Sequence, residues 1–420
     1  MKWGVYFFIF FSSVGFSLYA QTNHLSEIHF KGLKNTKSAF ITQFLETKKG
    51  EVLDSVQIQS DIIRLKRLPS ISNVTYEVIT FSNDQHNITF NFEENFTLIP
   101  AFNYWTTITT IAYKIGAYEY NLFGKNITLG GFYQYNGQNT FGLNFSAPYL
   151  FSKKWGLDFN FLNWKSEEPL YVGDQSANYV YQNNSYELLG SYELNFKNKL
   201  QLGLSLFNEH YKATKDVTSL DLPNDVETNK QLIKLIYTHQ NLDYYYFYIK
   251  GFKSVFNGQF VTANNNAQNN FLIAWNDFLY YKRVGARGNW ANRLRLGLST
   301  NNESPFAPFS LDNNINLRGV GNAVDRGTGS IVFNTEFRYT LVDKKNMALQ
   351  SNGFIDVGSW RTPGKSLGTF TNSENIQVYS GVGIRMIHKK IANINFRIDY
   401  GYGLTKNANR GFVFGIGQYF

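Results

Sequence analysis

The last three quarters of this 420-residue chain alternate apolar and polar residues, with turn-forming residues every ten to twenty positions. The pattern is clearest in 200–206, 294–299 and 394–400, where Leu, Ile or an aromatic residue takes every second position. Side chains of a β-strand point alternately to its two faces, so each segment predicts a strand with one apolar and one polar face. Helical periodicity is absent from about residue 96 onward.

A soluble β-sandwich would show the same alternation, so three further features are needed to choose between a sandwich and a barrel. The strands are often about ten residues long, as a tilted membrane-crossing strand requires. Aromatic residues crowd the strand ends, as at 244–248 and 280–281. Short and long connections alternate along the chain, and all three features are typical of outer-membrane β-barrels. The short connections are 123–125, 151–154, 197–199 and 343–345, and the long ones are 167–183, 213–227, 301–327 and 359–374.

We expect sixteen strands, near residues 97–105, 112–121, 127–136, 139–147, 156–166, 184–196, 200–211, 229–239, 243–253, 270–281, 290–300, 329–341, 350–358, 375–387, 391–403 and 411–420. An even number of antiparallel strands brings the chain back to the side of the barrel on which it began. The last strand is then expected to pair with the first and to close the sheet, so that no unpaired edge faces lipid.

The final segment, 411–420, carries apolar residues at alternate positions up to its last aromatic residue. Untied chain ends fray, so a strand that runs to a final aromatic residue must be held in a sheet. We therefore expect a C-terminal strand signal formed by Phe412, Phe414, Ile416 and Phe420. Gln418 departs from the pattern, because an apolar residue is expected there.

The composition is consistent with a membrane barrel. Charged residues make up only 17% of the chain, against about a quarter in soluble proteins. The mean hydropathy of −0.30 does not argue against a barrel, because the inner face of a barrel is polar. After the first twenty residues no stretch is apolar for the roughly 18 residues that a spanning helix needs. The chain has no Cys, which excludes disulfides and thiolate metal sites.

The net charge of +9 raises the question of nucleic-acid binding. Many lysines lie in short turns, such as 153–154, 344–345 and 389–390, rather than on one face. This distribution argues against a nucleic-acid partner.

Residues 1–20 have the features of a signal peptide. Lys2 supplies a positive charge, an apolar core covers 5–16, and Ala20 provides a small residue at the expected cleavage site. We therefore divide the chain into a signal peptide (1–20), a small α+β domain (21–95) and a β-barrel (96–420).

The small domain shows the order strand, helix, helix, strand, strand. The first strand covers 24–30, and Thr36 or Ser38 is expected to cap a helix that carries Phe40, Ile41, Phe44 and Leu45 on one face. Asp54 is expected to cap a second helix, which Pro69 ends. Two strands follow, at 74–81 and 88–92.

One group of residues in the barrel predicts a charged contact inside the bore. Arg318 and Gly319 lie in the longest loop, and the next strand alternates so that Glu336 faces away from its apolar side. The strand after that contains Phe354, Asp356 and Gly358, with Asp356 between two outward apolar residues. Two inner carboxylates near a loop arginine predict a charge-assisted clamp. The alternative is that Arg318 is a solvated loop residue.

This arrangement resembles the BamA/TamA superfamily, which includes the two-partner-secretion transporters. The resemblance implies that Arg318 and Gly319 form the tip of a loop that folds back into the barrel. It also implies that Arg318 meets Asp356 of a Phe-x-Asp-x-Gly strand (Phe354–Gly358), with Glu336 as a second acid. Val320 stands where the family has an aromatic residue. The segment 24–95 resembles a polypeptide-transport-associated (POTRA) domain, whose order of elements is the same.

The resemblance implies an outer-membrane insertase or translocase, with its N-terminal domain in the periplasm. The expected partners are unfolded outer-membrane or secreted client proteins and outer-membrane lipid, with accessory assembly proteins as a further class. The alternatives are a two-partner-secretion transporter and a passive porin-like channel. We expect no enzymatic activity, cofactor or metal, because the six histidines are scattered and no hydrolase motif is present.

Overall fold

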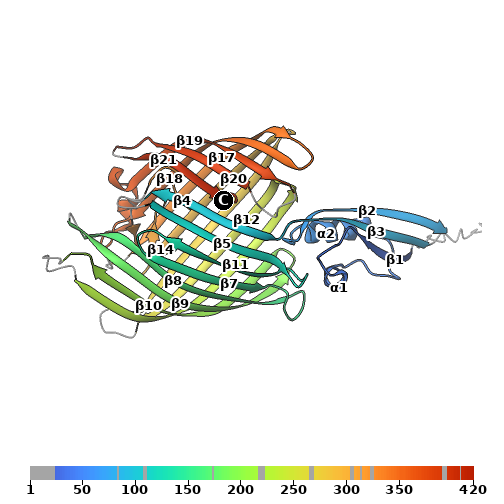
Figure 1. Cartoon of the computed structure of the whole chain (residues 1–420), viewed down its shortest axis with the longest axis horizontal. Coiled ribbons are helices and arrows are strands. Elements are labelled where there is room, and N and C mark those ends of the chain that lie inside the picture. Colours follow the sequence, from blue (N-terminus) through green and yellow to red (C-terminus); the bar gives the residue numbers. More distant parts are fainter. Residues whose placement is uncertain are drawn as a thin grey trace, which may run out of the picture.

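A computed structural model describes residues 24–82, 85–106, 111–172, 175–215, 223–263, 269–302, 307–312, 315–321, 326–389, 395–406 and 408–420. It consists of a large β-barrel with a small α+β unit at one end (Figure 1). The expected signal peptide lies outside the described residues. Within the described part of the chain, none of the helices is both long and apolar enough to cross a membrane.

The N-terminal unit has the element order that the sequence predicts: β1 (His24–Lys31), α1 (Ser38–Thr42), α2 (Ser55–Leu65), β2 (Ile71–Ser82) and β3 (Gln85–Glu94). Its sheet has the order β1-β3-β2, with β1 parallel and β2 antiparallel to β3. Both helices bury their apolar faces in one core with this sheet. The core includes Phe40, Ile41, Phe44, Leu45, Ile58, Ile62, Leu65, Ile88 and Phe90.

Of the two predicted helix caps, one is confirmed and one is wrong. Asp54 caps α2, because its Oδ1 accepts hydrogen bonds from the backbone N–H groups of Val56 (2.8 Å) and Gln57 (3.3 Å). The cap predicted for α1 is wrong, since its N-cap is Lys37, which makes no side-chain cap bond. The Thr36 hydroxyl instead accepts a hydrogen bond from Asn121 Nδ2 of the barrel, at 3.1 Å.

Sixteen antiparallel strands form the barrel, as predicted, and neighbours in the sheet follow the order of the sequence. They are β4 (Leu98–Thr106), β5 (Ile111–Leu122), β6 (Ile127–Tyr135), β7 (Asn139–Ala147), β8 (Trp155–Val172), β9 (Gln175–Asn195), β10 (Asn198–Ala213), β11 (Asp225–Tyr245), β12 (Tyr248–Ala263), β13 (Phe271–Val284), β14 (Gly288–Ser299), β17 (Gly329–Asp343), β18 (Met347–Arg361), β19 (Ile376–His388), β20 (Asn395–Gly403) and β21 (Arg410–Ile416).

Some connections at the end of the barrel away from the N-terminal unit contain short elements (Figure 1). Two-residue strands β15 (Phe309–Ser310) and β16 (Arg326–Gly327) pair between β14 and β17. Two 3-10 helices, η1 (Leu367–Thr371) and η2 (Ser373–Asn375), lie between β18 and β19.

Several strands are longer than the sequence predicts. The expected loop at 167–183 is largely strand, because β8 continues to Val172 and β9 begins at Gln175. Likewise β12 runs to Ala263, ten residues beyond the predicted end. The extended parts of β8 and β9 are rich in Asn, Gln and Ser. A wall that continues beyond the membrane needs only its backbone hydrogen bonds, so the apolar alternation that marks a strand is missing there. The extension of β12 instead keeps outward aromatic residues, Phe256 and Phe260.

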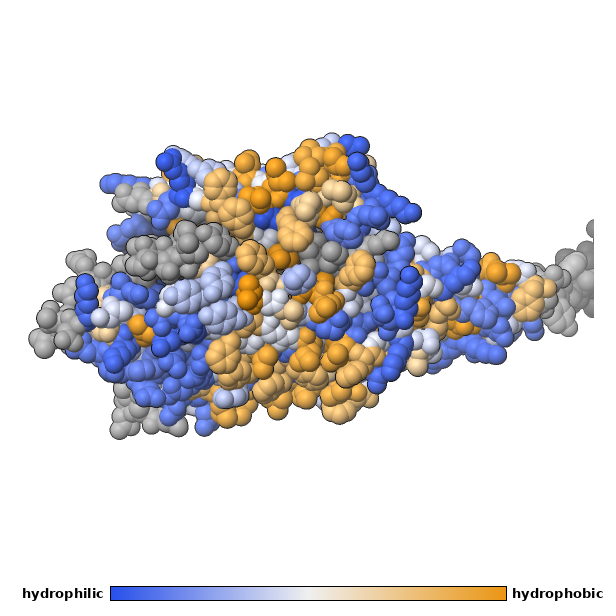
Figure 2. Space-filling view, viewed as in Figure 1, coloured by the Kyte–Doolittle hydropathy of each residue, from blue (hydrophilic) through white to orange (hydrophobic). Residues whose placement is uncertain are grey.

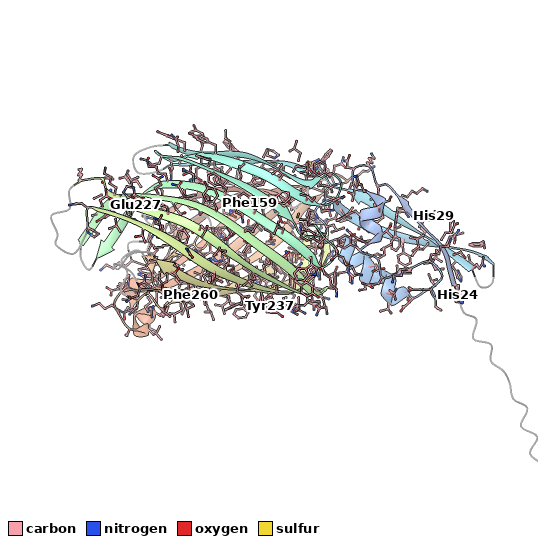
Figure 3. The ribbon with its side chains drawn as sticks, turned by 90° about the horizontal axis from the view of Figure 1, so that it is seen from below. His24, His29, Phe159, Glu227, Tyr237 and Phe260 are labelled. Carbon is pink, nitrogen blue, oxygen red and sulfur yellow. The ribbon has the colours of Figure 1, made fainter. Side chains whose placement is uncertain are left out.

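The two faces of the wall differ as the alternation predicts. On β17 the outward Phe333 and Phe337 are exposed, whereas the inward Asn334 and Glu336 are buried. An apolar belt covers the middle of the barrel between polar ends (Figure 2). Phe159, Tyr237 and Phe260 are exposed residues of this wall (Figure 3).

The sheet is not closed by a hydrogen-bonded ladder. β21 and β4 are the two ends of the strand order, and no register joins them among the described residues. The predicted pairing of the last strand with the first is therefore wrong. We call this contact between β21 and β4 the seam.

The last strand also ends earlier than predicted, at Ile416 rather than at Phe420. Gly417 has a φ of +98°, a conformation that favours glycine, and its N–H donates to the Asn395 carbonyl at 2.9 Å. The chain then turns into the bore. We call residues 417–420 the inner tail. Gln418 breaks the alternation because it does not belong to the strand.

Candidate functional site

The loop between β14 and β17 places its tip inside the barrel. Leu317 and Val320 are buried in an apolar cluster with Val332, Trp360 and Tyr379 of the wall. Val320 thus makes an apolar contact at the position where an aromatic residue was expected.

Two glycines make room for this loop tip. Gly319 has a φ of +99°, and a Cβ there would lie 2.7 Å from the Gly401 carbonyl oxygen. At Gly358 a Cβ would lie 2.8 Å from Leu317 Cδ1. A side chain at either position would push the loop away from the wall.

Arg318 is completely buried and is held by two carboxylates. Its Nε and Nη2 donate to the two oxygens of Asp356, each at 2.8 Å, in a bidentate pair. Its backbone N–H donates to Asp356 Oδ2 at 3.0 Å, and its Nη1 donates to Glu336 Oε2 at 2.6 Å. The guanidinium carbon also lies 3.6 Å from the centre of the Phe354 ring.

These contacts belong to a larger buried network. Glu336 also accepts hydrogen bonds from Arg338 and from Arg385 Nη2, the latter at 2.8 Å. Asp399 accepts from Arg397 Nη1 at 3.0 Å. We call Arg318, Arg338, Arg385, Arg397, Glu336, Asp356 and Asp399 the lumen cluster; all are less than 9% exposed. Its four guanidinium groups face three carboxylates, so each acid has at least one cationic partner.

The inner tail completes the surroundings of the lumen cluster. The Tyr419 ring centre lies 4.4 Å from the guanidinium carbon of Arg318 and 4.8 Å from that of Arg397. The Phe420 carbonyl accepts a hydrogen bond from Arg338 Nη2 at 3.0 Å. The Phe420 ring packs near Tyr281 and Ala291, on strands β13 and β14. The inner tail therefore crosses the bore from the last strand to another part of the wall.

The structure brings together six of the residues singled out in the sequence: Arg318, Gly319, Glu336, Phe354, Asp356 and Gly358. It separates the four residues of the expected C-terminal strand signal. Phe412 and Phe414 point outward and are exposed, and Ile416 ends β21. Phe420 lies inside the bore instead.

Sequence reasoning missed Arg385, Arg397, Asp399 and Tyr419. The three charged residues alternate with apolar residues in β19 and β20, so their inward direction could be predicted. Nothing in the pattern pairs them with a loop far away in the chain. Tyr419 could not be found, because the predicted strand runs through it.

A second set of contacts joins the N-terminal unit to the barrel. We call the barrel end that it contacts the near mouth. Arg67 donates from Nη1 to the Phe196 carbonyl at 2.8 Å and from Nη2 to the Leu242 carbonyl at 3.2 Å. Its guanidinium carbon lies 3.8 Å from the Phe196 ring centre. Arg67 thus ties the turn between β9 and β10, and the last part of β11, to the end of α2.

Other contacts spread this junction around the near mouth. Asn126 exchanges two hydrogen bonds with Ser70, both 2.9 Å long. Lys153 Nζ lies 2.9 Å from Glu46 Oε1, which also accepts from Arg64 Nη1 at 2.9 Å. The hydrogen bond from Lys153 has the larger effect and the one from Arg64 adds to it. Together they hold the pKa of Glu46 below its ordinary value.

The three acids of the lumen cluster are all hydrogen-bonded to arginines. Within the described ranges, no group of three or more His, Cys, Asp or Glu residues could hold a metal ion. The geometry can hold a loop in the bore and can release it if the ion pairs are broken.

Comparison with known proteins gives the family. A family model for the Omp85 superfamily domain matches residues 121–420, and a POTRA model, described as a surface antigen variable number repeat, matches residues 24–95. No curated protein matches the chain.

Solved structures share the fold at low sequence identity. The crystal structure of BamA from Haemophilus ducreyi lacking POTRA domains 1–3 has 16% identity and a TM-score of 0.55, and the match covers 94% of this chain and 83% of that one. CdiB from Escherichia coli has 12% identity and a TM-score of 0.62, with 94% and 76% covered. CdiB from Acinetobacter baumannii has 13% identity and a TM-score of 0.58, with 94% and 73% covered.

The barrel with its loop inside the bore and the small unit at its near mouth agree with both family models. The chain belongs to the Omp85 superfamily, as a sixteen-stranded outer-membrane β-barrel preceded by one POTRA domain.

Proposed function

We propose that this protein inserts client polypeptides into the bacterial outer membrane or moves them across it, with its POTRA domain in the periplasm. The Omp85 barrel implies the outer membrane. The near mouth would then face the periplasm, and residues 1–20 would be the leader that directs export.

The observation that carries this proposal is the seam. An unpaired strand edge in lipid costs several kcal/mol for each unsatisfied backbone group. A barrel that only had to form a stable pore would close this edge. A seam without a ladder offers edges to which a client strand can add, or a place where the wall can part.

The lumen cluster supports a controlled path rather than an open one. The loop tip and the inner tail both lie in the bore. Arg318 of the loop tip is paired with Asp356 of the wall and lies against the Tyr419 ring of the inner tail. We propose that this contact holds the barrel in a resting state. A client would have to shift it, or use the seam without entering the bore.

The POTRA sheet would supply the first contact for clients. Its strand order leaves β1 and β2 as edges, and main-chain pairing to a sheet edge binds extended chains of many sequences. On β2, Ile79 and Phe81 are exposed apolar residues at the end away from the barrel. Clients would therefore be unfolded outer-membrane or secreted proteins, with outer-membrane lipid as the second partner.

Two alternative functions would each require a different structure. A two-partner-secretion transporter would carry one client through the bore, and we favour assembly because the seam leaves strand edges unpaired while the loop tip and the inner tail occupy the bore. A passive channel would need an open bore and no client-binding domain. Enzymatic activity forms no part of the proposal.

The proposal can be tested in proteoliposomes that contain the purified protein. One assay measures insertion of an urea-unfolded outer-membrane protein, read as its resistance to protease. A second assay measures efflux of a small dye. We expect insertion above that of protein-free vesicles, with little dye efflux. Efflux without insertion would instead identify a passive channel.

A further inference from the structure

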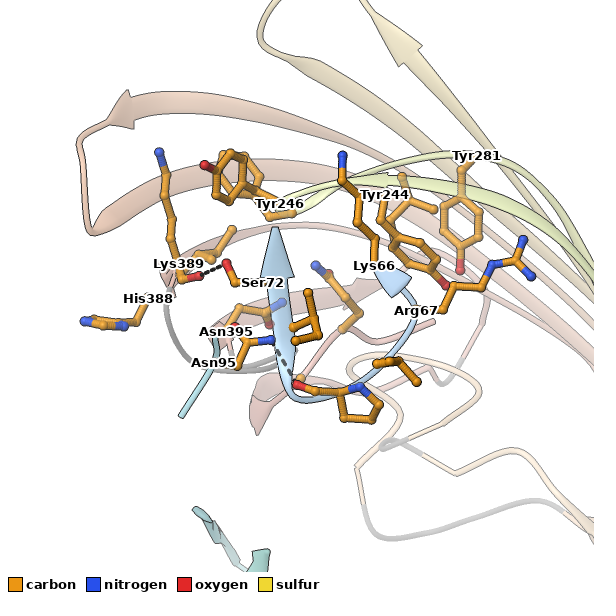
Figure 4. A pocket seen from close by; sticks show the side chains of 18 of the residues that line it. Lys66, Arg67, Ser72, Asn95, Tyr244, Tyr246, Tyr281, His388, Lys389 and Asn395 are labelled. Atoms are coloured by element: carbon orange, nitrogen blue, oxygen red, sulfur yellow. Dashed lines mark hydrogen bonds between the residues drawn. The ribbon is translucent and has the colours of Figure 1, made fainter. Parts of the chain in front are cut away.

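A cavity of about 420 Å³ lies where the POTRA domain meets the near mouth. Its walls come from the segment 66–72 between α2 and β2, the turn between β11 and β12, the ends of β19 and β20, and the inner tail. Figure 4 shows side chains of the POTRA domain and of the barrel around the same space. It lies apart from the lumen cluster, although the inner tail borders both.

Four buried polar atoms on this lining have no hydrogen-bond partner among the described residues. They are Arg67 Nε, His388 Nδ1, Asn395 Oδ1 and Gln418 Oε1. Asn395 is only 3% exposed, so its amide cannot turn to bulk solvent. Buried polar groups are normally hydrogen-bonded. A cavity that offers both donors and acceptors matches a polypeptide backbone, which carries one of each per residue.

The charge of the lining is positive. Lys66, Arg67 and Lys389 line the cavity, and no Asp or Glu is among the lining residues. Lys389 pairs with Asp343 outside it, whereas Lys66 has no ion pair in the described part of the chain. Rings of Tyr246 and Phe247 also line the cavity, so it offers an apolar surface next to the cations.

We propose that this cavity binds an extended segment of a client polypeptide that carries an acidic residue beside an apolar one. This inference rests on the function proposed above and names where a client is held before it reaches the seam. Its lining includes the inner-face residues Tyr281 and Asn395, not the outward apolar belt. A polypeptide arriving along the POTRA domain reaches this space directly, whereas a membrane lipid would have to leave its leaflet.

The inner tail connects the cavity to the lumen cluster. Gln418 and Phe420 form part of its wall, and Tyr419 between them contacts Arg318. A bound segment would therefore contact Gln418 and Phe420, the two neighbours of the tyrosine that lies against the loop arginine.

Photo-crosslinking in the full-length protein tests the site. Phe247 is replaced by benzoylphenylalanine, and the protein is reconstituted in nanodiscs that contain phosphatidylglycerol. The probes are two short unstructured peptides of Gly, Ser and Phe, one with Asp and the other with Lys at the same positions. The matched control carries the same label in place of Phe151, which is 75% exposed on the turn after β7 and does not line the cavity.

We expect the Asp peptide to crosslink at position 247 about tenfold more than the Lys peptide, the ratio for a binding difference of about 1.4 kcal/mol. No selective crosslink is expected at position 151. Lys66→Glu should abolish the preference for Asp, whereas Lys49→Glu, an exposed change in the POTRA segment between α1 and α2, should keep it. Crosslinks to phospholipid alone, equal labelling by both peptides or no labelling would each overturn the proposal.

Client insertion is measured on the same preparations, so that the cavity site and the proposed insertase function are tested separately. Insertion without a selective crosslink would leave the proposed function standing and remove the cavity site. A selective crosslink in a protein that inserts no client would keep the binding site and overturn the insertase proposal.

Discussion

Two arginines attach separate parts of the chain to the barrel, and they use different chemistry. Arg318 holds the loop through two carboxylates in a site with no solvent exposure. Arg67 holds the POTRA domain through neutral carbonyl groups and the Phe196 ring, and it is only partly buried.

The difference indicates which attachment can open. Removing one partner of a buried ion pair leaves a charge without water or counter-ion, which is strongly destabilising. A hydrogen bond to a carbonyl near solvent can be replaced by one to water, so its net contribution is smaller. We therefore expect the POTRA domain to leave the near mouth more readily than the loop leaves the bore.

The largest effect is expected from Asp356→Ala. This change removes three hydrogen bonds from Arg318 and should cost about 3–5 kcal/mol, as for other broken buried ion pairs. Urea unfolding in detergent, followed by heat-modifiability on gels, measures the loss. Asp243→Ala, at an exposed position of β11, should change stability by less than about 0.5 kcal/mol. Equal stability of the two variants would contradict our account of the loop contact.

Arg67→Ala should have a smaller effect, and a local one. It removes hydrogen bonds from a charged group to three carbonyls, a loss of about 1–3 kcal/mol. Hydrogen exchange of the amides in 66–72 should accelerate, while the exchange of β17 and β18 stays unchanged. Lys48→Ala on the exposed surface of the POTRA domain serves as the control. If exchange in β17 also accelerated, the two attachments would not be independent.

The inner tail allows a finer comparison through Tyr419. Tyr419→Ala removes a ring from beside Arg318 and Arg397, and a desolvated cation–π contact is worth about 2 kcal/mol. Tyr419→Phe keeps the ring and should stay closer to the original stability. The urea midpoints of both variants test this. Equal losses for Phe and Ala would show that the hydroxyl, not the ring, matters.

The smallest effect concerns pH at the junction. The pKa of Glu46 is lowered by Lys153 and Arg64, so its contribution is present above its ordinary value of 4.5 and is lost as the pH falls through the lowered pKa. Protease sensitivity of the POTRA–barrel junction should rise over that acidic interval. Glu46→Gln should be insensitive to the same change of pH. A junction that tightens on acidification would reverse the sign we assign.

Much of the architecture is predictable because each strand crosses between lipid and a polar bore. That requirement places apolar residues at every second position, and it led to the correct number of strands. The same reasoning predicted that Glu336 and Asp356 face inward. The Asp54 cap was predictable because a cap depends only on residues next to it.

The predictions that were wrong have two other causes. The extended parts of β8 and β9 lie outside the region where an apolar face is needed, so their sequence resembles that of a loop. The path of residues 417–420 depends on partners in β13, β14 and the loop, which are distant in sequence.

The sequence by itself determined the periodic elements: the sixteen strands, the POTRA order of elements, and the inner or outer direction of each strand residue. These follow from local periodicity and from the contrast between lipid and water. Only the tertiary structure decided that the seam lacks a ladder, that four arginines share three acids, and that the inner tail reaches Arg318. Each of these depends on distances between segments far apart in the chain, and alternation along one strand carries no information about them.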